Sequence, residues 1–314
     1  MSAIFAVDLG ATWLRTARVA PDGRWIDRKA RVPTPDGPAE ARKLIETAWR
    51  RAGCAEAVAL ATAPELDSDG VVRRWPNRRD YEGAPLLTDA LRCVARLALF
   101  DDATAAALSA DDVDGAADAI TLCLSIGSGI GGGVVIAGRP LVGAHHAAMD
   151  AGHMPVPSAA GLRCACGRDG CLQAVASGGA LQRHGGGALF GDARAEPALH
   201  RATAALAEAL AILQALFDPE RVVIAGGLGL SPLFDRIAAE LKRSGVALAI
   251  APHHHGDDAA LVGAAIGLAR GLAPRASTSA AISPPAARGD PRCKVSSPNG
   301  YQPGRVSTTR TSGA

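Results

Sequence analysis

Three glycine-rich stretches, each at the end of an apolar run, constrain the fold of this chain more than any other feature. They read DLGAT at residues 8–12, GSGIGGG at 127–133 and VVIAGGLGLS at 222–231. Glycine permits tight turns and lets a ligand approach backbone amides closely, so a strand that ends in glycines suits phosphate or nucleotide binding. Each stretch alone is also compatible with an ordinary turn. Three of them in this order predict a nucleotide site built from strand ends.

Strand and helix patterns alternate along both halves of the chain. Apolar runs at 3–8 and 57–64 predict strands, and residues 38–52 have the apolar spacing of an amphipathic helix. A long helix is predicted at 197–219 and a closing helix at 260–272. This alternation implies α/β architecture with parallel or mixed sheets. The 314 residues, 48% of them hydrophobic, suffice for two domains, and we expect two similar lobes with a cleft between them.

Charge and composition exclude several classes of partner. The formal charge of +2 comes from 33 basic and 31 acidic residues that are well mixed, so nucleic acid and anionic membranes are not expected partners. No apolar run approaches the roughly 20 residues that span a bilayer, and the first residues enter a strand pattern without a signal peptide. We therefore expect a cytoplasmic protein. Residues 274–314 are rich in Pro, Ser, Thr, Gly and Arg, and they predict a disordered tail.

A cluster of three cysteines reads CACGRDGC at 164–171. A disulfide, a redox centre and a metal site are the alternatives for such a cluster. The odd total of seven cysteines argues against a disulfide framework. The C-x-x-C spacing of thioredoxin-like chemistry is absent. These observations favour a metal site.

Adjacent carboxylates in LFDDATAAAL, Asp101 and Asp102, stand where a strand pattern meets a helix start. Such carboxylates could open to a cleft and accept the proton of an attacking hydroxyl. The alternative is that one of them simply caps the helix. Neither a P-loop nor a dinucleotide-binding fingerprint is present in the sequence.

These motifs resemble those of the ROK family of sugar kinases and related repressors, within the actin-like ATPase superfamily that includes hexokinases. The resemblance covers about residues 3–272, and its most specific part is GHMPV at 152–156 followed by the cysteine cluster. It implies a two-lobed actin-like (ribonuclease H-like) fold. The small lobe would take 1–101 completed by helix 260–273, and the large lobe 102–259.

The resemblance also implies site residues, cofactors and a reaction. Asp102 would be the general base for transfer of the ATP γ-phosphoryl group, with Mg²⁺ as the catalytic cation. His153 would join the three cysteines in a structural Zn²⁺ site. The nucleotide contacts would be Asp8, Gly10, Thr12, Gly127, Ser128, Gly129, Gly131, Gly226 and Gly227. The zinc ligands would be His153, Cys164, Cys166 and Cys171. The acceptor contacts would be Asn77, Asp101, Asp150, His153 and Gln173.

Three acceptor contacts depart from the family pattern. Asp101 replaces Asn, Asp150 replaces Glu, and Gln173 replaces Glu, while the base and phosphate loops are retained. This pattern predicts an altered acceptor, and we expect a C7-cyclitol of the valiolone type phosphorylated at a primary hydroxyl. The alternatives are glucose or another hexose, and a non-catalytic sugar-binding protein.

Two further expectations come from the sequence and its resemblance. A DNA-binding repressor is not expected, because its helix-turn-helix would precede the first phosphate motif and Asp8 leaves no room for it. A homodimer is plausible by resemblance. Arg74, Arg78 and Arg79, near Asn77, are interpreted as a solvated face.

Overall fold

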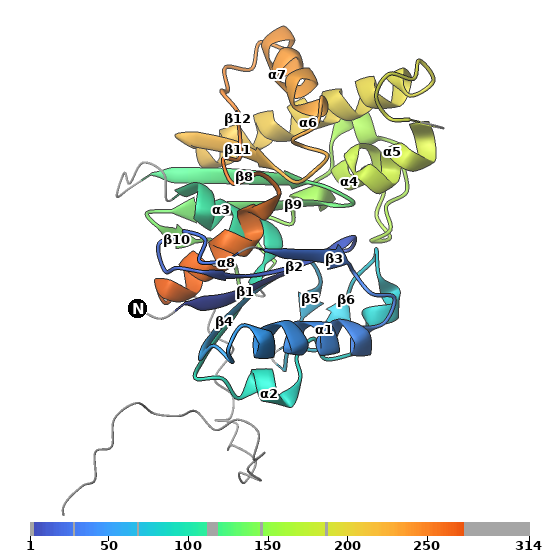
Figure 1. Ribbon diagram of the computed structural model, residues 1–314. Helices are drawn as coiled ribbons and strands as arrows, with labels where there is room; N and C mark the ends of the chain where they lie inside the picture. Colours follow the sequence, from blue (N-terminus) through green and yellow to red (C-terminus); the bar gives the residue numbers. More distant parts are fainter. Residues whose placement is uncertain are drawn as a thin grey trace, which may run out of the picture. The chain divides into compact units, whose positions relative to one another are not determined.

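The computed structural model describes residues 3–27, 29–67, 69–111, 119–144, 147–185 and 188–272, all within one compact unit, Met1–Ser277. Two five-stranded sheets with helices between and outside them make up this unit (Figure 1). The α/β architecture predicted from the alternating patterns is confirmed. The expected tail 274–314 lies outside the described residues.

The first sheet combines three parallel strands with two antiparallel ones. Its strands, in order across the sheet, are β3 (Ala30–Pro33), β2 (Trp13–Val19), β1 (Ile4–Leu9), β4 (Ala57–Thr62) and β7 (Arg96–Asp101). β1, β4 and β7 are parallel, and β2 and β3 are antiparallel to their neighbours. All residues of β1 and β4 are buried, as expected of parallel strands with both faces covered.

The second sheet repeats this order and these directions. Its strands are β10 (Arg139–Pro140), β9 (Ile130–Ile136), β8 (Ile120–Ile126), β11 (Arg221–Ala225) and β12 (Ala251–Pro252). β8, β11 and β12 are parallel, and β9 and β10 are antiparallel. The three glycine loops follow β1, β8 and β11. In open α/β sheets, the carboxyl ends of the strands are where ligands bind.

Helices lie in three layers. They are α1 (Pro38–Arg51), α2 (Asp89–Arg92), α3 (Asp102–Asp111), α4 (Leu172–Ala176), α5 (Gly178–Gly185), α6 (Glu196–Phe217), α7 (Leu233–Arg243) and α8 (Ala259–Ala269). α3 and α8 lie between the two sheets, α1 and α2 cover the outer face of the first sheet, and α6 and α7 cover the second (Figure 1). Single turns of 3₁₀ helix are η1 (Arg79–Tyr81), η2 (Ala151–His153), η3 (Pro157–Ala159) and η4 (Gly256–Asp258), and β5 (Glu65–Leu66) pairs with β6 (Val72–Arg74).

The central layer is packed through small residues. Ala103–Ala110 are all buried, because α3 contacts both sheets and α8. A Cβ atom at Gly263 would lie 1.6 Å from the carbonyl oxygen of Ala105. The two helices therefore approach so closely that only glycine fits at position 263.

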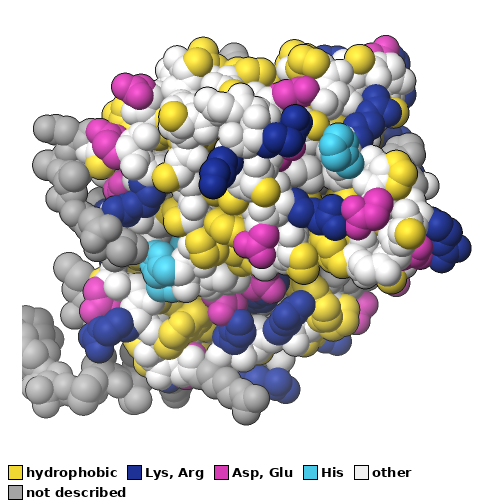
Figure 2. Space-filling model, turned by 90° about the horizontal axis from the view of Figure 1, so that it is seen from above, with side chains coloured by type: hydrophobic (Ala, Val, Ile, Leu, Met, Phe, Trp, Pro, Cys, Tyr) yellow, Lys and Arg dark blue, Asp and Glu magenta, His cyan; other side chains and the backbone are white. Residues whose placement is uncertain are grey.

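The surface carries mixed charge. On the face shown in Figure 2, basic and acidic side chains are interspersed with apolar ones. This agrees with the balanced composition of the chain. Within the described residues, no helix combines the length and the apolar character needed to cross a bilayer.

Candidate active site and metal centre

The first two glycine loops meet through their hydroxyl side chains. The first loop follows β1, and the Gly10 amide donates to the carbonyl of Trp13 over 3.0 Å, which closes the turn before β2. Thr12 Oγ1 lies 2.9 Å from Ser128 Oγ of the second loop, 116 positions away along the chain. The structure therefore joins the two loops that the sequence predicts to bind phosphates.

The second glycine loop divides between a turn and a strand. Residues 127–129 form the turn after β8, whereas the next glycines belong to β9. A Cβ atom at Gly133 would lie 2.4 Å from the carbonyl oxygen of Ala103, and one at Gly131 would lie 3.7 Å from Asp102 Oδ1. The glycines of β9 thus allow α3 to pack against the sheet. The sequence predicts that several amides of this loop face an anion, and the nucleotide contact by Gly131 stays a prediction.

The third glycine loop is held against the end of β8. Gly226 has a φ of 80°, the left-handed conformation that favours glycine. A Cβ atom there would lie 2.5 Å from the carbonyl oxygen of Ile126. The same carbonyl accepts hydrogen bonds from the amides of Leu228 and Gly229 at 3.1 and 2.9 Å. Gly226 and its neighbour Gly227 are therefore placed beside the second loop.

Asp8, at the end of β1, is a buried carboxylate with incomplete charge compensation. Arg15 Nη1 donates to Asp8 Oδ2 over 2.8 Å. Arg15 Nη2 lies 3.8 Å from Asp257 Oδ2. Burial nevertheless raises the pKa of Asp8 to about 6; Arg15 opposes this rise, and the charges of Asp258 and Asp257 add to it. The site has carboxylate oxygens in excess of cations, which is the donor set that Mg²⁺ prefers. Asp8 thus fits a role in holding Mg²⁺ or one of its waters.

Asp101 and Asp102 make different contacts at the junction of β7 and α3. Asp101 Oδ1 accepts the amide hydrogen of Thr104 over 2.9 Å, so Asp101 caps α3. Asp102 is the first residue of α3, and its carboxylate lies beside Gly131 of β9. The residue predicted as the base is therefore the one that the cap leaves available.

Both carboxylates have raised pKa values. The pKa of Asp101 is raised to about 7, mainly by loss of hydration. The negative charge of Asp102 adds to this rise, and that of Asp150 contributes less. Loss of hydration and the charge of Asp8 raise the pKa of Asp102 to about 6. Solvent still reaches both side chains, so protein surrounds these groups without covering them. Raised pKa values of this kind are frequent at catalytic sites.

Two predicted acceptor contacts converge on the turn of the second loop. A Cβ atom at Gly129 would lie 2.9 Å from Gln173 Oε1 and 3.3 Å from Asn77 Nδ2. Gln173 Oε1 also accepts the amide hydrogen of Ile130 over 3.1 Å. Asn77 and Gln173, from distant parts of the sequence, therefore flank the same glycine.

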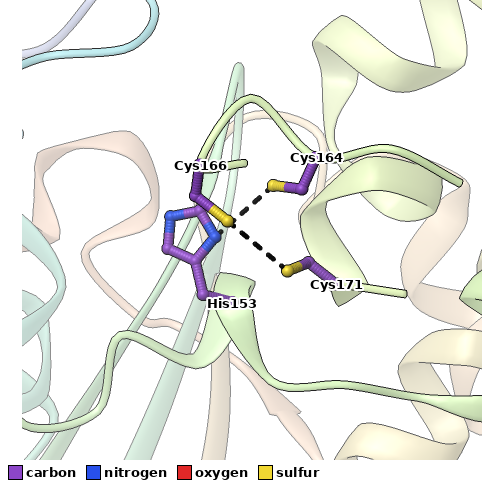
Figure 3. A group of neighbouring side chains, drawn as sticks. All are labelled: His153, Cys164, Cys166 and Cys171. Carbon is purple, nitrogen blue, oxygen red and sulfur yellow. Dashed lines mark hydrogen bonds between the residues drawn. The ribbon is translucent and has the colours of Figure 1, made fainter. Parts of the chain in front are cut away.

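His153 and the three cysteines face one another (Figure 3). Their ligand atoms all lie within 4.8 Å of one another. His153 Nδ1 lies 3.5 Å from Cys164 Sγ, and Cys166 Sγ lies 3.7 Å from Cys171 Sγ. A tetrahedral zinc ion would place its ligands about 3.6 Å (N to S) and about 3.8 Å (S to S) apart, given the usual bond lengths. Both the chemistry and the spacing of this group fit zinc.

The metal group adjoins two acceptor contacts. Asp150 Oδ2 lies 3.8 Å from His153 Nε2, the ring nitrogen that faces away from the cysteines. Gln173 is the second residue after Cys171 and belongs to α4. A metal held by His153 and Cys171 would therefore fix the backbone that carries Asp150 and Gln173.

Arg78 was expected on a solvated face, and the structure contradicts this. Its side chain is only 13% exposed, and its guanidinium donates to the carbonyl oxygens of Ala11, Thr34 and Pro35. The expectation rested on three arginines in a short polar stretch. The neighbouring Trp75 and Tyr81, which are buried, were the sequence signal that this stretch folds against the core.

Comparisons with known proteins agree with the geometry. The profile of the ROK family matches residues 4–270. A kanosamine kinase of Amycolatopsis mediterranei is 36% identical, over 61% of this chain and 69% of that protein. An N-acetyl-D-glucosamine kinase of Escherichia coli is 30% identical, over 83% of this chain and 97% of that protein.

Solved structures are similar over most of both chains. A ROK hexokinase from Thermus thermophilus has 31% identity and a TM-score of 0.69, covering 84% of this chain and 97% of its own. A ROK family glucokinase from Streptomyces griseus, in complex with glucose and AMPPNP, has 26% identity and a TM-score of 0.71, with 86% and 100% covered.

Proposed function

Because the chain belongs to the ROK family, we propose that it is a kinase that transfers the γ-phosphoryl group of ATP to a hydroxyl of a sugar-like acceptor, with Asp102 as the general base. The fold is the two-lobed actin-like one of its structural relatives, and sugar kinases are its named relatives. The position of Asp102 carries the proposal, because this carboxylate lies beside Gly131, just after the turn of the second glycine loop, whereas Asp101 accepts the amide hydrogen of Thr104 at the start of α3.

The proposed reaction assigns a task to each group of residues. Asp102 accepts the proton of the attacking hydroxyl, whose oxygen forms a bond to the γ-phosphorus while the bond to the β,γ-bridging oxygen breaks and ADP leaves. The glycine loops orient the phosphates, and Asp8 would hold Mg²⁺ or one of its waters. Magnesium supplies positive charge to the transferring phosphoryl group.

The metal group would act on the acceptor indirectly. His153, Cys164, Cys166 and Cys171 form a closed set of four ligands, which is typical of structural zinc. By immobilising the backbone that carries Asp150 and Gln173, zinc would hold the acceptor contacts in place.

The charges at the acceptor side favour a cationic substrate. Asp102 and Asp150 lie close enough to Asp101 for their negative charges to raise its pKa. An acceptor with a protonated amine would compensate this charge. The kanosamine kinase relative acts on a hexose with a free amine, and we propose an amino sugar of this kind as the acceptor. Asp101 in place of Asn supports the same proposal.

A C7-cyclitol is the second candidate. It is favoured by the three altered contacts, Asp101, Asp150 and Gln173. The relatives named above act on sugars, and the cyclitol stays a prediction.

The test is ADP release with ATP–Mg over kanosamine, glucose, N-acetylglucosamine, N-acetylmannosamine, inositols and a valiolone-type cyclitol, with zinc-replete protein. The highest kcat/KM on kanosamine would support the amino-sugar proposal. The highest value on the cyclitol would replace it with the second candidate, and the highest value on glucose would contradict both. Ligand binding without any turnover would instead indicate a non-catalytic protein.

A further inference from the structure

Arg78 and Asn77 are neighbours in the chain but face different loops. Asn77 Nδ2 is close to Gly129 in the turn of the second phosphate loop. Arg78 donates from Nη1 to the carbonyl oxygens of Ala11 at 3.2 Å and Thr34 at 3.4 Å, and from Nη2 to that of Pro35. One short segment thus reaches both phosphate loops.

One carbonyl that Arg78 contacts belongs to the first phosphate loop, and another belongs to Thr34, which is hydrogen-bonded to that loop. Ala11 lies within that loop. Thr34 donates from its hydroxyl to the Gly10 carbonyl over 2.7 Å and from its amide to the Thr12 carbonyl over 3.0 Å. Arg78 therefore holds the first loop both directly and through Thr34.

The guanidinium itself is held in a fixed orientation. Asp80 accepts from its Nε and Nη2 at 3.2 and 3.1 Å, and the Tyr81 ring lies 4.8 Å from its central carbon. Tyr81 also donates its hydroxyl to the carbonyl oxygen of Pro35 over 2.8 Å. A planar guanidinium held in this way can donate hydrogen bonds to several acceptors at once, whereas the compact ammonium group of a lysine does not match this geometry.

We propose that Arg78 is a positioning residue that couples acceptor binding to ATP–Mg binding. This inference rests on the proposed kinase function. The contacts form a closed chain from the first loop through Arg78 and Asn77 to the second loop, and back through the hydrogen bond between Thr12 and Ser128. An acceptor that orders Asn77 orders Arg78 with it. The first loop is then fixed in the conformation that binds phosphates, so each ligand favours the other.

The experiment measures the Kd of AMPPNP–Mg by calorimetry, without and with saturating kanosamine. In wild-type protein, saturating kanosamine is expected to lower the Kd of AMPPNP–Mg by about 5-fold or more. A change of about 5-fold is the lower end of typical coupling between two ligands. Arg78→Met, which keeps the apolar stem, is expected to reduce this ratio to about 1. Arg79→Met is the matched control, since Arg79 is exposed and is the next residue, the first of η1. Its ratio should equal that of wild type.

Other outcomes separate this inference from the proposed function. A wild-type ratio in Arg78→Met, or a ratio of 1 in the wild type despite turnover of kanosamine, would overturn the coupling role. If Arg78→Met does not fold by circular dichroism, Arg78→Lys replaces it, with an intermediate ratio expected and a wild-type ratio contradicting the inference. If no acceptor of the panel is turned over, the kinase proposal fails. In that case the Kd of AMPPNP–Mg without acceptor tests whether Arg78 positions the first loop. An unchanged Kd in Arg78→Met relative to wild type would overturn the positioning role.

Discussion

Neighbouring residues of the same type have different tasks in this protein. Asp101 ends β7 and caps α3 through the amide of Thr104, whereas Asp102 begins α3 and faces Gly131. Arg78 is packed beneath a phosphate loop, while Arg79 is exposed. The sequence could predict which residue types lie at the site. Only the structure shows which of two neighbouring side chains caps a helix or packs against a loop.

Asp102→Asn is expected to lower kcat by at least about 100-fold, because the amide cannot accept the proton of the acceptor hydroxyl. Acceptor affinity, measured by calorimetry, should change little. The start of α3 should also stay intact, since Asp101 keeps the helix cap. A rate near that of wild type would remove Asp102 from the role of base.

The same substitution is expected to stabilise the nucleotide-free protein at neutral pH. The pKa of Asp102 is raised from 3.8 to about 6 in the fold, so the folded state binds more protons than the unfolded state between these values and loses stability as pH rises through them. Asp102→Asn should therefore gain about 1–2 kcal/mol over wild type above pH 6, and nothing near pH 4. Urea unfolding of both proteins at several pH values measures this difference. A pH-independent difference would contradict the assigned shift.

Asp101→Asn tests the charge at the acceptor side without removing the helix cap, because Asn is as good a cap as Asp. The ratio of kcat/KM for kanosamine to that for glucose is expected to fall about 10-fold, the effect of about 1.4 kcal/mol. Thermal unfolding provides the control for an intact fold. An unchanged ratio would show that Asp101 does not recognise an amine.

At the scale of elements, the loop from His153 to Cys171 is held partly by its own backbone. The amide of Val156 donates to the carbonyl of Gly170 over 3.0 Å, and Glu208 of α6 accepts from the amide and hydroxyl of Ser158 at 2.9 and 2.7 Å. These contacts attach the middle of the loop to the second half of the fold. The two ends are joined by the amide of Leu172, which donates to the carbonyl of Met154 over 2.9 Å. We expect a bound metal to add a further cross-link between His153 and the three cysteines.

Cys166→Ser is expected to abolish stoichiometric zinc, since a serine hydroxyl is a poor zinc ligand. The KM for the acceptor should rise about 10-fold or more, while the Kd of AMPPNP–Mg should change little, because the glycine loops lie outside the metal group. Metal analysis and kinetics measure these effects. Cys93→Ser, at an exposed cysteine, is the control. Full zinc content in Cys166→Ser would contradict the ligand assignment.

The elements also show how far the sequence could predict the fold. The strands that carry the glycine loops and the helices at 38–52 and 197–219 were predicted, because each has a clear apolar pattern. The placement of α3 could not be, since a helix buried all round has no apolar stripe to indicate its partners. For the same reason the sequence could not show that the glycines of β9 make room for α3.

At the scale of the whole molecule, the contact between α3 and α8 is expected to contribute strongly to stability, because these two helices lie between the sheets and contact their strands. Gly263→Ala is expected to lower the free energy of unfolding by about 3 kcal/mol, since the added methyl group meets the backbone carbonyl of Ala105. Urea unfolding measures this loss.

Gly267→Ala is the matched control for that loss. It gains the same helix propensity in α8, about 1 kcal/mol, but its methyl group meets the Phe100 side chain, which can move more easily than backbone. A smaller loss than that of Gly263→Ala is therefore expected. Equal losses would show that side-chain packing in this layer is as rigid as the backbone.

The position of α8 has a consequence for the order in which the chain is made. The strands of the first sheet are complete at residue 101, yet Ala6, Ala59 and Ala98 on its inner face are covered by α8, at 259–269. During synthesis, this apolar face remains open while more than half of the chain is still to be added. We therefore expect nascent chains to be prone to aggregation until α8 emerges, and chaperones to be of most use to them in that interval.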